Sequence, residues 1–548
     1  MKRTRESTRS PHSRLPAALA LATTVTLACG TLASAAPQTS APHPEEHGAD
    51  KHTSALSDVI PAPTSVEPDR GAKFRIKWHT GIHAPRGNAE ANRVARYLQQ
   101  RLRPSTRYGL LINRGTPGRG DIVLSLDGSE QRLGEAGYRM NVDKKRLSIR
   151  ATSSEGLFNG VQTLRQLLPA KAESDSPRHG PWKVPAGEIV DKPRFEHRSA
   201  MLDVARHFFD VDQVKRYIDQ IAQYKINYLH LHLTDDQGWR IQIDGWPRLT
   251  SHGGSTEVGG GDGGYYTKRE YAEIVDYAAE NNVTIVPEID MPGHTNAALS
   301  SYAELNCDGK APPLYTGIEV GFSSLCVDKE VTYRFVDDVI RQVAAMTPGQ
   351  YLHIGGDEAH STTDEDYRKF MSEVLPMVEK HGKTPLGWHE YAQAEPSKSA
   401  MVQYWGTTRS NSEVAEAADR GNDILLSPAN KAYVDQKYNP DTELGLDWAG
   451  PTTVRQAYDW NPGDFLESVP DSAIAGVEAP LFSETVTNSD EIEFMAFPRM
   501  PAIAELGWSS PEELDWSSFR RRLAGQAASW QEQGIDFYRS EQVPWPGN

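Results

Sequence analysis

Two adjacent carboxylates, Asp357 and Glu358, follow a short apolar run over residues 351–354. Gly355 and Gly356 separate the run from the acids, and a ligand can approach the backbone there because glycine has no side chain. Successive side chains of a strand point to opposite faces, so we expect the two acids to leave the strand end in different directions. Two carboxyls this close cannot both ionise freely, and the less solvated one keeps its proton toward neutral pH, as a general acid requires. The simpler alternative is a solvated acidic strand end.

Acidic and aromatic side chains follow other apolar runs in the same way. They are Asp203 and Arg206, Asp235 and Asp236, Asp290 and His294, Trp388 and Glu390, Trp405, Tyr433 and Asp435, and Glu484. Carboxylates and arginine bind hydroxyl groups in pairs, and tryptophan faces pack against the C–H surface of a sugar ring. A solvated surface would mix such positions with lysine and serine. The pattern therefore indicates a carbohydrate site.

Eight short apolar runs carry these side chains. They cover residues 199–204, 228–233, 283–289, 351–354, 385–388, 401–405, 423–426 and 474–477, the last extending to 482. Amphipathic stretches such as 211–224 and 268–280 separate them. Strands and helices alternating in this way predict an α/β fold, a (β/α)8 barrel over residues 193–548, whose active site lies at the C-terminal ends of the strands.

A small α+β domain is expected before the barrel, over residues 58–192. The patterns that predict it are strands at 73–78 and 121–126, a hairpin over 138–150, and helices at 89–102 and 154–168. This segment holds no cluster of acids, histidines or cysteines, so we expect it to have a structural role.

The N-terminus has the charged, apolar and small-residue order of a secretory signal. We expect residues 1–36 to be that signal, residues 37–57 to be a flexible leader, and the protein to be secreted. A membrane anchor is the weaker alternative because threonine and serine dilute the segment, and Cys29 leaves a lipoprotein signal open. No other stretch is long and apolar enough to span a bilayer.

The net charge and the cysteine content restrict the classes of partner and the covalent bonds that we expect. The 548 residues carry a formal net charge of −16 with a pI near 5.6, which argues against nucleic acid as a partner. Removal of the signal leaves Cys307 and Cys326, and an exported protein with two cysteines favours one disulfide bond. The oligomeric state is not readable from the sequence.

Four motifs occur in order along the expected barrel. They are Asp203-Val-Ala-Arg-His-Phe208, His230-Leu-His-Leu-Thr-Asp-Asp-Gln-Gly-Trp239, Glu288-Ile-Asp-Met-Pro-Gly-His294 and His353-Ile-Gly-Gly-Asp-Glu358. Together they resemble the signatures of the family 20 glycoside hydrolases, the β-N-acetylhexosaminidases. The resemblance covers the chain from about residue 58 onward. It implies an exo-acting enzyme that removes terminal β-linked N-acetylglucosamine, and also N-acetylgalactosamine, from chitin fragments or glycans, with no cofactor and no metal.

The resemblance implies that the substrate supplies the nucleophile. Glu358 would protonate the leaving oxygen and then activate water, while Asp357 would orient the 2-acetamido group and stabilise an oxazolinium ion. Further roles come from the same resemblance: Tyr433 binds the acetamido oxygen, Trp388 and Trp405 form aromatic walls, Arg206, Asp435 and Glu484 hold hydroxyl groups, and Asp235 with His294 forms a relay behind the acid. One position departs from the family pattern: Phe482 stands where the family usually has tryptophan under the sugar. This difference predicts weaker binding of the sugar or an altered substrate preference, with the mechanism retained.

Three other functions stay open from the residues alone. A metal-dependent amidohydrolase barrel would use His230 and His232 as ligands, with His294, His353 and Asp357 as further ones. A degenerate barrel would bind sugar without cleaving it. A related enzyme would release a disaccharide instead of a monosaccharide.

Overall fold

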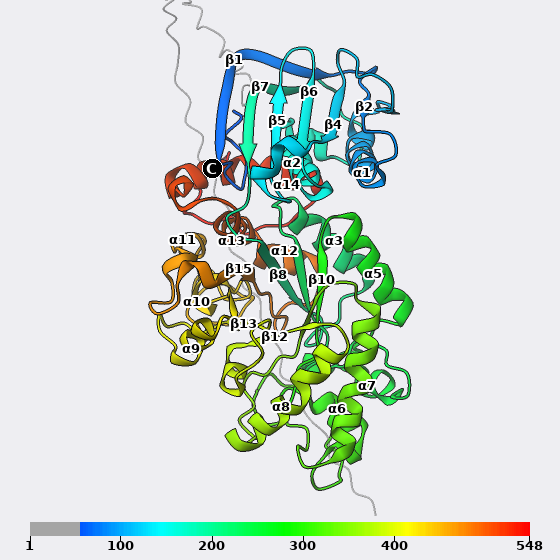
Figure 1. Cartoon of the computed structure of the whole chain (residues 1–548), viewed down its shortest axis with the longest axis vertical. Helices are drawn as coiled ribbons and strands as arrows, with labels where there is room; N and C mark the ends of the chain where they lie inside the picture. The colour runs from blue at the N-terminus through cyan, green and yellow to red at the C-terminus, as the bar shows by residue number, and fades with distance from the viewer. Residues whose placement is uncertain (1–54, 548) are drawn as a thin grey trace, which may run out of the picture. The chain divides into compact units, whose positions relative to one another are not determined.

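The computed structural model describes residues 55–547. The expected signal, Cys29 and most of the expected leader lie outside these residues. Within them the chain forms a seven-stranded sheet followed by a closed barrel of eight strands (Figure 1). Among the described residues, no helix combines the length and the apolar character that a membrane crossing needs.

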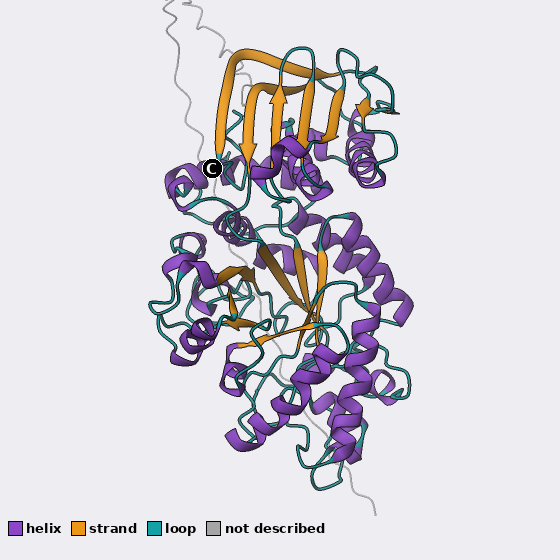
Figure 2. Ribbon diagram, in the orientation of Figure 1, coloured by secondary structure: helices purple, strands orange, loops and turns teal. Residues whose placement is uncertain are grey.

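The N-terminal sheet has the strand order β1-β7-β5-β6-β4-β2-β3. Its strands are β1 (Ser65–Ile76), β2 (Ile82–His83), β3 (Ile112–Asn113), β4 (Ile122–Leu126), β5 (Tyr138–Val142), β6 (Leu147–Ala151) and β7 (Trp182–Asp191). Helices α1 (Ala89–Thr106) and α2 (Ser154–Leu167) pack against this sheet (Figure 2). The expected α+β domain is therefore present, with its hairpin formed by β5 and β6.

Strand β7 was not expected from the sequence. It contains Pro185 and Gly187, both of which normally weaken a strand interior. Its partner β1 has an irregular register between Pro68 and Lys73, and Pro68 pairs with Gly187. The proline and glycine are accommodated because the pairing itself is irregular there.

All eight expected barrel strands form, and they pair in parallel in the closed order β10-β11-β12-β13-β14-β15-β8-β9. They are β8 (His197–Asp203), β9 (Tyr228–His232), β10 (Thr284–Glu288), β11 (Tyr351–His353), β12 (Thr384–Trp388), β13 (Met401–Tyr404), β14 (Asp423–Leu426) and β15 (Ile474–Ala479). The predicted (β/α)8 barrel is confirmed. Because a parallel barrel buries its strands on both faces, nearly continuous apolar runs identified them.

Helices fill the connections between the strands (Figure 2). They are α3 (Val211–Ala222), α4 (Arg248–Ser251), α5 (Lys268–Glu280), α6 (Asn296–Ser301), α7 (Glu330–Met346), α8 (Asp364–Lys380), α9 (Ser412–Arg420), α10 (Ala429–Ala432), α11 (Val454–Tyr458), α12 (Ser489–Ala496), α13 (Arg499–Trp508) and α14 (Trp516–Gln533). Two of these helices start at reciprocal capping boxes, which Asp210 and Gln213 form at α3 and Thr267 and Glu270 form at α5.

A buried carboxylate joins the sheet to the barrel. Asp191, the last residue of β7, accepts hydrogen bonds from Tyr138, from Nζ of Lys225 and from the indole of Trp508, each over 2.8 Å. Lys225 and Asp191 are both fully buried. The ion pair is therefore shielded from solvent and held by three directional contacts.

Candidate active site

The acid pair lies on the loop after β11, which ends at His353. Three residues of this loop have a left-handed backbone: Gly355 at φ +66°, Gly356 at +97° and Glu358 at +47°. Glu358 bears a side chain, so its conformation costs about 1–3 kcal/mol and persists only because the surroundings hold it. His294, on the loop after β10, has the same property at φ +54°.

The space beside Gly355 is filled by Asp290. A Cβ atom at Gly355 would stand 1.8 Å from Oδ1 of Asp290, and the N–H of Gly356 donates to that oxygen over 3.2 Å. This corrects the expectation that a ligand approaches the backbone there. Glycine is needed because a buried carboxylate packs against it.

Both carboxylates of the pair face one imidazole. Nε2 of His294 lies 3.5 Å from Oδ2 of Asp357 and 3.4 Å from Oε2 of Glu358. The expected divergence is therefore wrong, because the left-handed backbone at Gly355, Gly356 and Glu358 ends the alternation of a strand. Oδ1 of Asp357 is buried and has no hydrogen-bond partner among the described residues, so it is available to a ligand.

The carboxyl of Asp357 has a raised pKa. Burial raises the pKa of this carboxyl to about 6, with Glu358 adding to the effect and His294 opposing it. Its side chain is 16% exposed against 27% for Glu358. The less solvated carboxyl is thus the one that the resemblance assigns to orienting the substrate, and not the expected proton donor.

Asp235 lies behind His294. Its Oδ1 is 3.2 Å from Nδ1 of His294, and its Oδ2 is 2.8 Å from both Nε2 of His232 and a guanidinium nitrogen of Arg206. Burial favours the protonated form of Asp235, but Arg206 and His294 outweigh it and hold its pKa well below the usual range. Burial likewise opposes a charge on His294, and Asp235 with Asp357 raises the pKa of that imidazole well above its usual value. The geometry is that of a relay from Asp235 through His294 to the pair.

A second group of charges lies beside Phe482. Oδ1 of Asp435 is buried without a partner in the described part of the chain, and burial together with Glu484 raises the pKa of Asp435 to about 7. The guanidinium of Arg206 lies 5.2 Å from the ring centre of Phe482. These groups offer acceptors and a donor for hydroxyl groups beside an aromatic face.

Two other acids from the strand ends support loops instead. Asp203 accepts from the backbone N–H groups of Ala205, Arg206 and Ser483. Asp236 accepts from the backbone of Asn296 and from the hydroxyl of Ser323. They fix the loops that carry the site.

Aromatic side chains line the site. The indole N–H of Trp388 donates to Oε1 of Glu288 over 3.0 Å, and that of Trp405 donates to Glu390 over 3.0 Å. Tyr433 is buried, with its ring centre 5.4 Å from that of Phe482. Burial, and then Asp435 and Asp357, raises the pKa of Tyr433 well above its usual value, so the phenol keeps its proton.

Trp448 was not among the site residues expected from the sequence. Its ring is 52% exposed and lies 5.8 Å from Trp405 and 5.9 Å from Tyr433. It stands far along the loop after β14, so a search of strand ends could not find it. An exposed tryptophan edge-on to two site aromatics extends this aromatic surface outward.

Comparison with known proteins decides the family. The model of the glycosyl hydrolase family 20 catalytic domain matches residues 195–366 and 360–511, and that of family 20 domain 2 matches residues 56–192. A β-N-acetylhexosaminidase of Cellulomonas fimi is 42% identical over 435 residues, which is 79% of this chain and 86% of that protein. The chain belongs to glycosyl hydrolase family 20.

Solved structures agree with this family 20 assignment. The family 20 β-N-acetylhexosaminidase of Streptomyces coelicolor A3(2) superposes with a TM-score of 0.87 at 57% identity, covering 90% of this chain and 99% of that one. A mutant Streptomyces plicatus β-hexosaminidase in complex with its product, N-acetylglucosamine, gives 0.87 at 58% identity, covering 90% and 98%. The protein is therefore a glycoside hydrolase with a family 20 fold.

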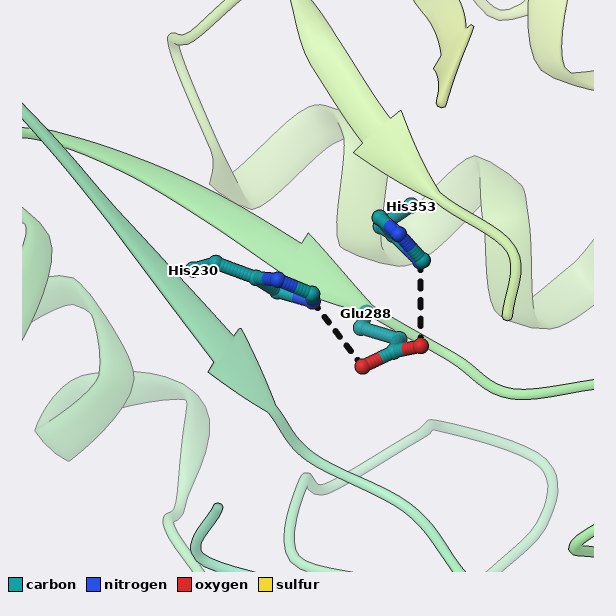
Figure 3. A group of neighbouring side chains, drawn as sticks. All are labelled: His230, Glu288 and His353. Carbon is teal, nitrogen blue, oxygen red and sulfur yellow. Dashed lines mark hydrogen bonds and ion pairs between the residues drawn. The ribbon is translucent and has the colours of Figure 1, made fainter. Parts of the chain in front are cut away.

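The histidines of the metal-enzyme alternative are engaged with carboxylates in this family 20 barrel. His230, Glu288 and His353 lie near enough for a metal ion, with ligand atoms within 4.8 Å of one another (Figure 3). However, His230 lies 2.9 Å from Glu288 and 3.0 Å from Glu478, and Nδ1 of His353 accepts the N–H of Gly355. These contacts use both ring nitrogens of His230 and Nδ1 of His353, and Nε2 of His353 lacks a partner within residues 55–547. The donor set of His230, Glu288 and His353 does not fit a metal site.

The expected disulfide is present. Cys307 and Cys326 are bonded and close the loop between them. This loop reaches the strand ends: the backbone of Gly317 accepts from Gln237, and that of Pro313 accepts from Asn296. The disulfide thus holds a loop that packs beside the active site.

Proposed function

We propose that this family 20 protein is an exo-acting, retaining β-N-acetylhexosaminidase. It releases terminal non-reducing β-linked N-acetylglucosamine, and N-acetylgalactosamine, from chitooligosaccharides or glycans. The observation that carries the proposal is the buried, unpartnered Oδ1 of Asp357 next to Glu358. A 2-acetamido sugar needs an acceptor for its N–H and a proton donor for its glycosidic oxygen, and the adjacent pair offers both. The name of the Cellulomonas relative supports the same reaction.

In the first step the substrate's own acetamido oxygen attacks the anomeric carbon. The bond from that carbon to the leaving oxygen breaks, and the proton of Glu358 passes to this oxygen. The product is an oxazolinium ion, whose positive charge the ionised Asp357 stabilises at close range. Holding the amide in place converts the attack into an intramolecular reaction, which lowers its entropic barrier.

In the second step Glu358, now a carboxylate, takes a proton from water. The resulting oxygen forms a bond to the anomeric carbon as the oxazolinium ring opens, so the sugar leaves with its original configuration. His294 lies 3.4 Å from Glu358 and is itself held by Asp235, which keeps a positive charge beside the carboxylate that develops.

The remaining residues bind the sugar. Tyr433 donates to the acetamido oxygen, and Trp388 and Trp405 enclose the group. Arg206, Asp435 and Glu484 hold hydroxyl groups of the terminal sugar, and Phe482 supplies the face beneath its ring.

A pair of chromogenic substrates tests the reaction. The protein should hydrolyse a nitrophenyl β-N-acetylglucosaminide and not the matching glucoside, which lacks the amide. Glu358→Gln should lower kcat by about 10²–10⁴-fold because it removes the general acid. Equal rates on the two substrates would refute substrate assistance. Product analysis on chitooligosaccharides and on an N-acetylgalactosaminide separates monosaccharide from disaccharide release and ranks the two sugars.

The protein is further proposed to be secreted, with residues 1–36 as its signal. The charged and apolar order of these residues supports this. Expression in a secreting host, followed by N-terminal sequencing of the extracellular protein, should give a chain that begins near Pro37. A cell-bound, lipid-labelled product would favour the lipoprotein signal at Cys29.

A further inference from the structure

Glu288 occupies the centre of a buried polar cluster inside the barrel. It is the last residue of β10 and is fully buried. His230 and His232 reach it from β9, His353 from β11 and Trp388 from β12 (Figure 3 shows His230 and His353 pointing at it). The reaction proposed above gives this carboxylate no role.

One oxygen of Glu288 binds Trp388, the tryptophan that we assign to the wall of the sugar pocket. Oε1 accepts the indole N–H of Trp388 over 3.0 Å. Trp388 is itself buried, so its ring cannot exchange this acceptor for water. A hydrogen bond to a charged acceptor fixes the plane of the indole more strongly than one to a neutral acceptor would.

The other oxygen of Glu288 contacts histidines that lead to the relay of Asp235 and His294 behind the acid pair. Oε2 contacts Nε2 of His230 over 2.9 Å and Nδ1 of His232 at hydrogen-bond distance. The far nitrogen of His232, Nε2, lies 2.8 Å from Oδ2 of Asp235. Because both neighbours of His232 are carboxylates, its imidazole donates on both sides, and it aligns Asp235 with His294.

The electrostatics agree with two protonated imidazoles. Burial opposes a charge on His232, but Glu288 and Asp235 outweigh it and raise its pKa well above the usual value. Burial likewise opposes a charge on His230, and Glu478 with Glu288 raises its pKa to about 9. Carboxylates and imidazolium ions therefore alternate through the barrel interior from Glu478 to Asp235.

We propose that Glu288 is a positioning residue that couples the wall of the sugar pocket to the acid relay. Through one oxygen it orients Trp388, and through the other it orients His232 and thereby Asp235. The inference rests on the proposed function. It adds that the fit of the acetamido group and the alignment of the proton donor depend on one buried carboxylate.

Only a carboxylate can accept hydrogen bonds through both of its side-chain oxygens. In Glu288→Gln the amide has one accepting oxygen, so its NH₂ group faces either the indole N–H of Trp388 or the histidine N–H groups. The conflict at the histidines is relieved when an imidazole loses its proton, so the variant should bind sugar better as pH rises through that ionisation. The titratable groups that face Glu288 or act on it are His230 and His232 from β9, His353 from β11, and Asp290 and Asp357 from the following loops.

A double-mutant cycle tests the coupling. Glu288→Gln, Trp388→Phe and the double variant are compared with the native protein for kcat and KM on the nitrophenyl β-N-acetylglucosaminide, and for affinity toward N-acetylglucosamine by calorimetry, between pH 5 and 9. Glu288→Gln should lower kcat about 10–100-fold, the range of other positioning residues, and raise KM several-fold. Phenylalanine has no N–H to satisfy, so the double variant should have the KM and affinity of Trp388→Phe alone, without the pH dependence that Glu288→Gln introduces.

Glu493→Gln is the matched control. Glu493 is a buried carboxylate on α12 that accepts from Arg216 and Gln220, away from the site. It should lower Tm while kcat and KM stay native. Glu288→Gln behaving in the same way, with a lower Tm and native kinetics, would overturn the proposal, and so would additive effects on KM in the double variant.

Two outcomes need separate treatment. If Glu288→Gln does not fold, Trp388→Phe decides. It removes the indole N–H that holds Oε1, so the carboxylate can shift relative to His232; kcat should then fall about two- to fivefold together with the rise in KM, and a native kcat would refute the coupling. If the native protein does not hydrolyse the substrate, the proposed function fails, and non-additive losses of affinity for N-acetylglucosamine still decide the role of Glu288.

Discussion

In the proposed reaction, Asp357 is useful only when it is ionised. The oxazolinium ion is positive, and a protonated carboxyl offers no charge to stabilise it. Burial gives Asp357 a pKa of about 6, so its proton is lost within the range in which such an enzyme can be assayed.

The acid side of the pH profile should therefore report Asp357. We expect kcat/KM of the native protein to fall as pH drops through about 6. Asp357→Asn should lower kcat by about 10²–10³-fold and remove this limb, because the amide does not titrate. An unchanged acid limb in the variant would assign the ionisation to another group.

In the proposed binding mode, Phe482 offers the sugar a smaller face than tryptophan would. Its ring centre lies 5.4 Å from Tyr433 and 5.2 Å from the guanidinium of Arg206. Phe482→Trp should lower KM, since an indole has a larger and more electron-rich face for both the sugar and the cation, with kcat nearly unchanged. Phe482→Leu, which removes the aromatic face, should raise KM. An unchanged or higher KM in the tryptophan variant would contradict this.

The loop closed by Cys307 and Cys326 is the element that the disulfide stabilises. The two cysteines are 19 residues apart, and closing a loop of this size stabilises the fold by about 3 kcal/mol. Replacing both cysteines by serine should lower the free energy of unfolding by that order, and it should raise KM because Gln237 and Asn296 lose firm backbone partners. Denaturant unfolding and KM measurements check both effects, with the native protein under reducing conditions as a parallel case. Unaltered KM would show that the loop keeps its place without the bond.

The barrel strands could be predicted because each is buried on both faces, and the site because its residues follow those strands. What the sequence could not supply depends on the backbone between elements. The left-handed conformations at Gly355 and Glu358 turn both acids toward His294, and no periodic pattern encodes that turn. Strand β7 escaped because Pro185 and Gly187 are tolerated only in its irregular pairing. Trp448 escaped because it lies far from any strand end.

At the scale of the whole molecule, the α+β sheet is held to the barrel by Asp191. This carboxylate and Lys225 are buried together at the junction. Burial lowers the pKa of Lys225, with Asp191 opposing that shift. Asp191 therefore favours the charged form of the buried lysine at this junction.

Asp191→Asn should destabilise the whole chain. It leaves the ammonium of Lys225 buried without a counter-charge, which costs about 3–5 kcal/mol. Asp191→Asn combined with Lys225→Met should recover much of the loss, because replacing both members of a buried pair avoids the unpaired charge. Thermal unfolding of the two variants measures this, and the kcat of the folded protein should stay native in both, because neither residue contacts the acid pair. Equal destabilisation of the single and double variants would show instead that the hydrogen bonds of Asp191 to Tyr138 and Trp508, and not the charge pair, hold the two parts together.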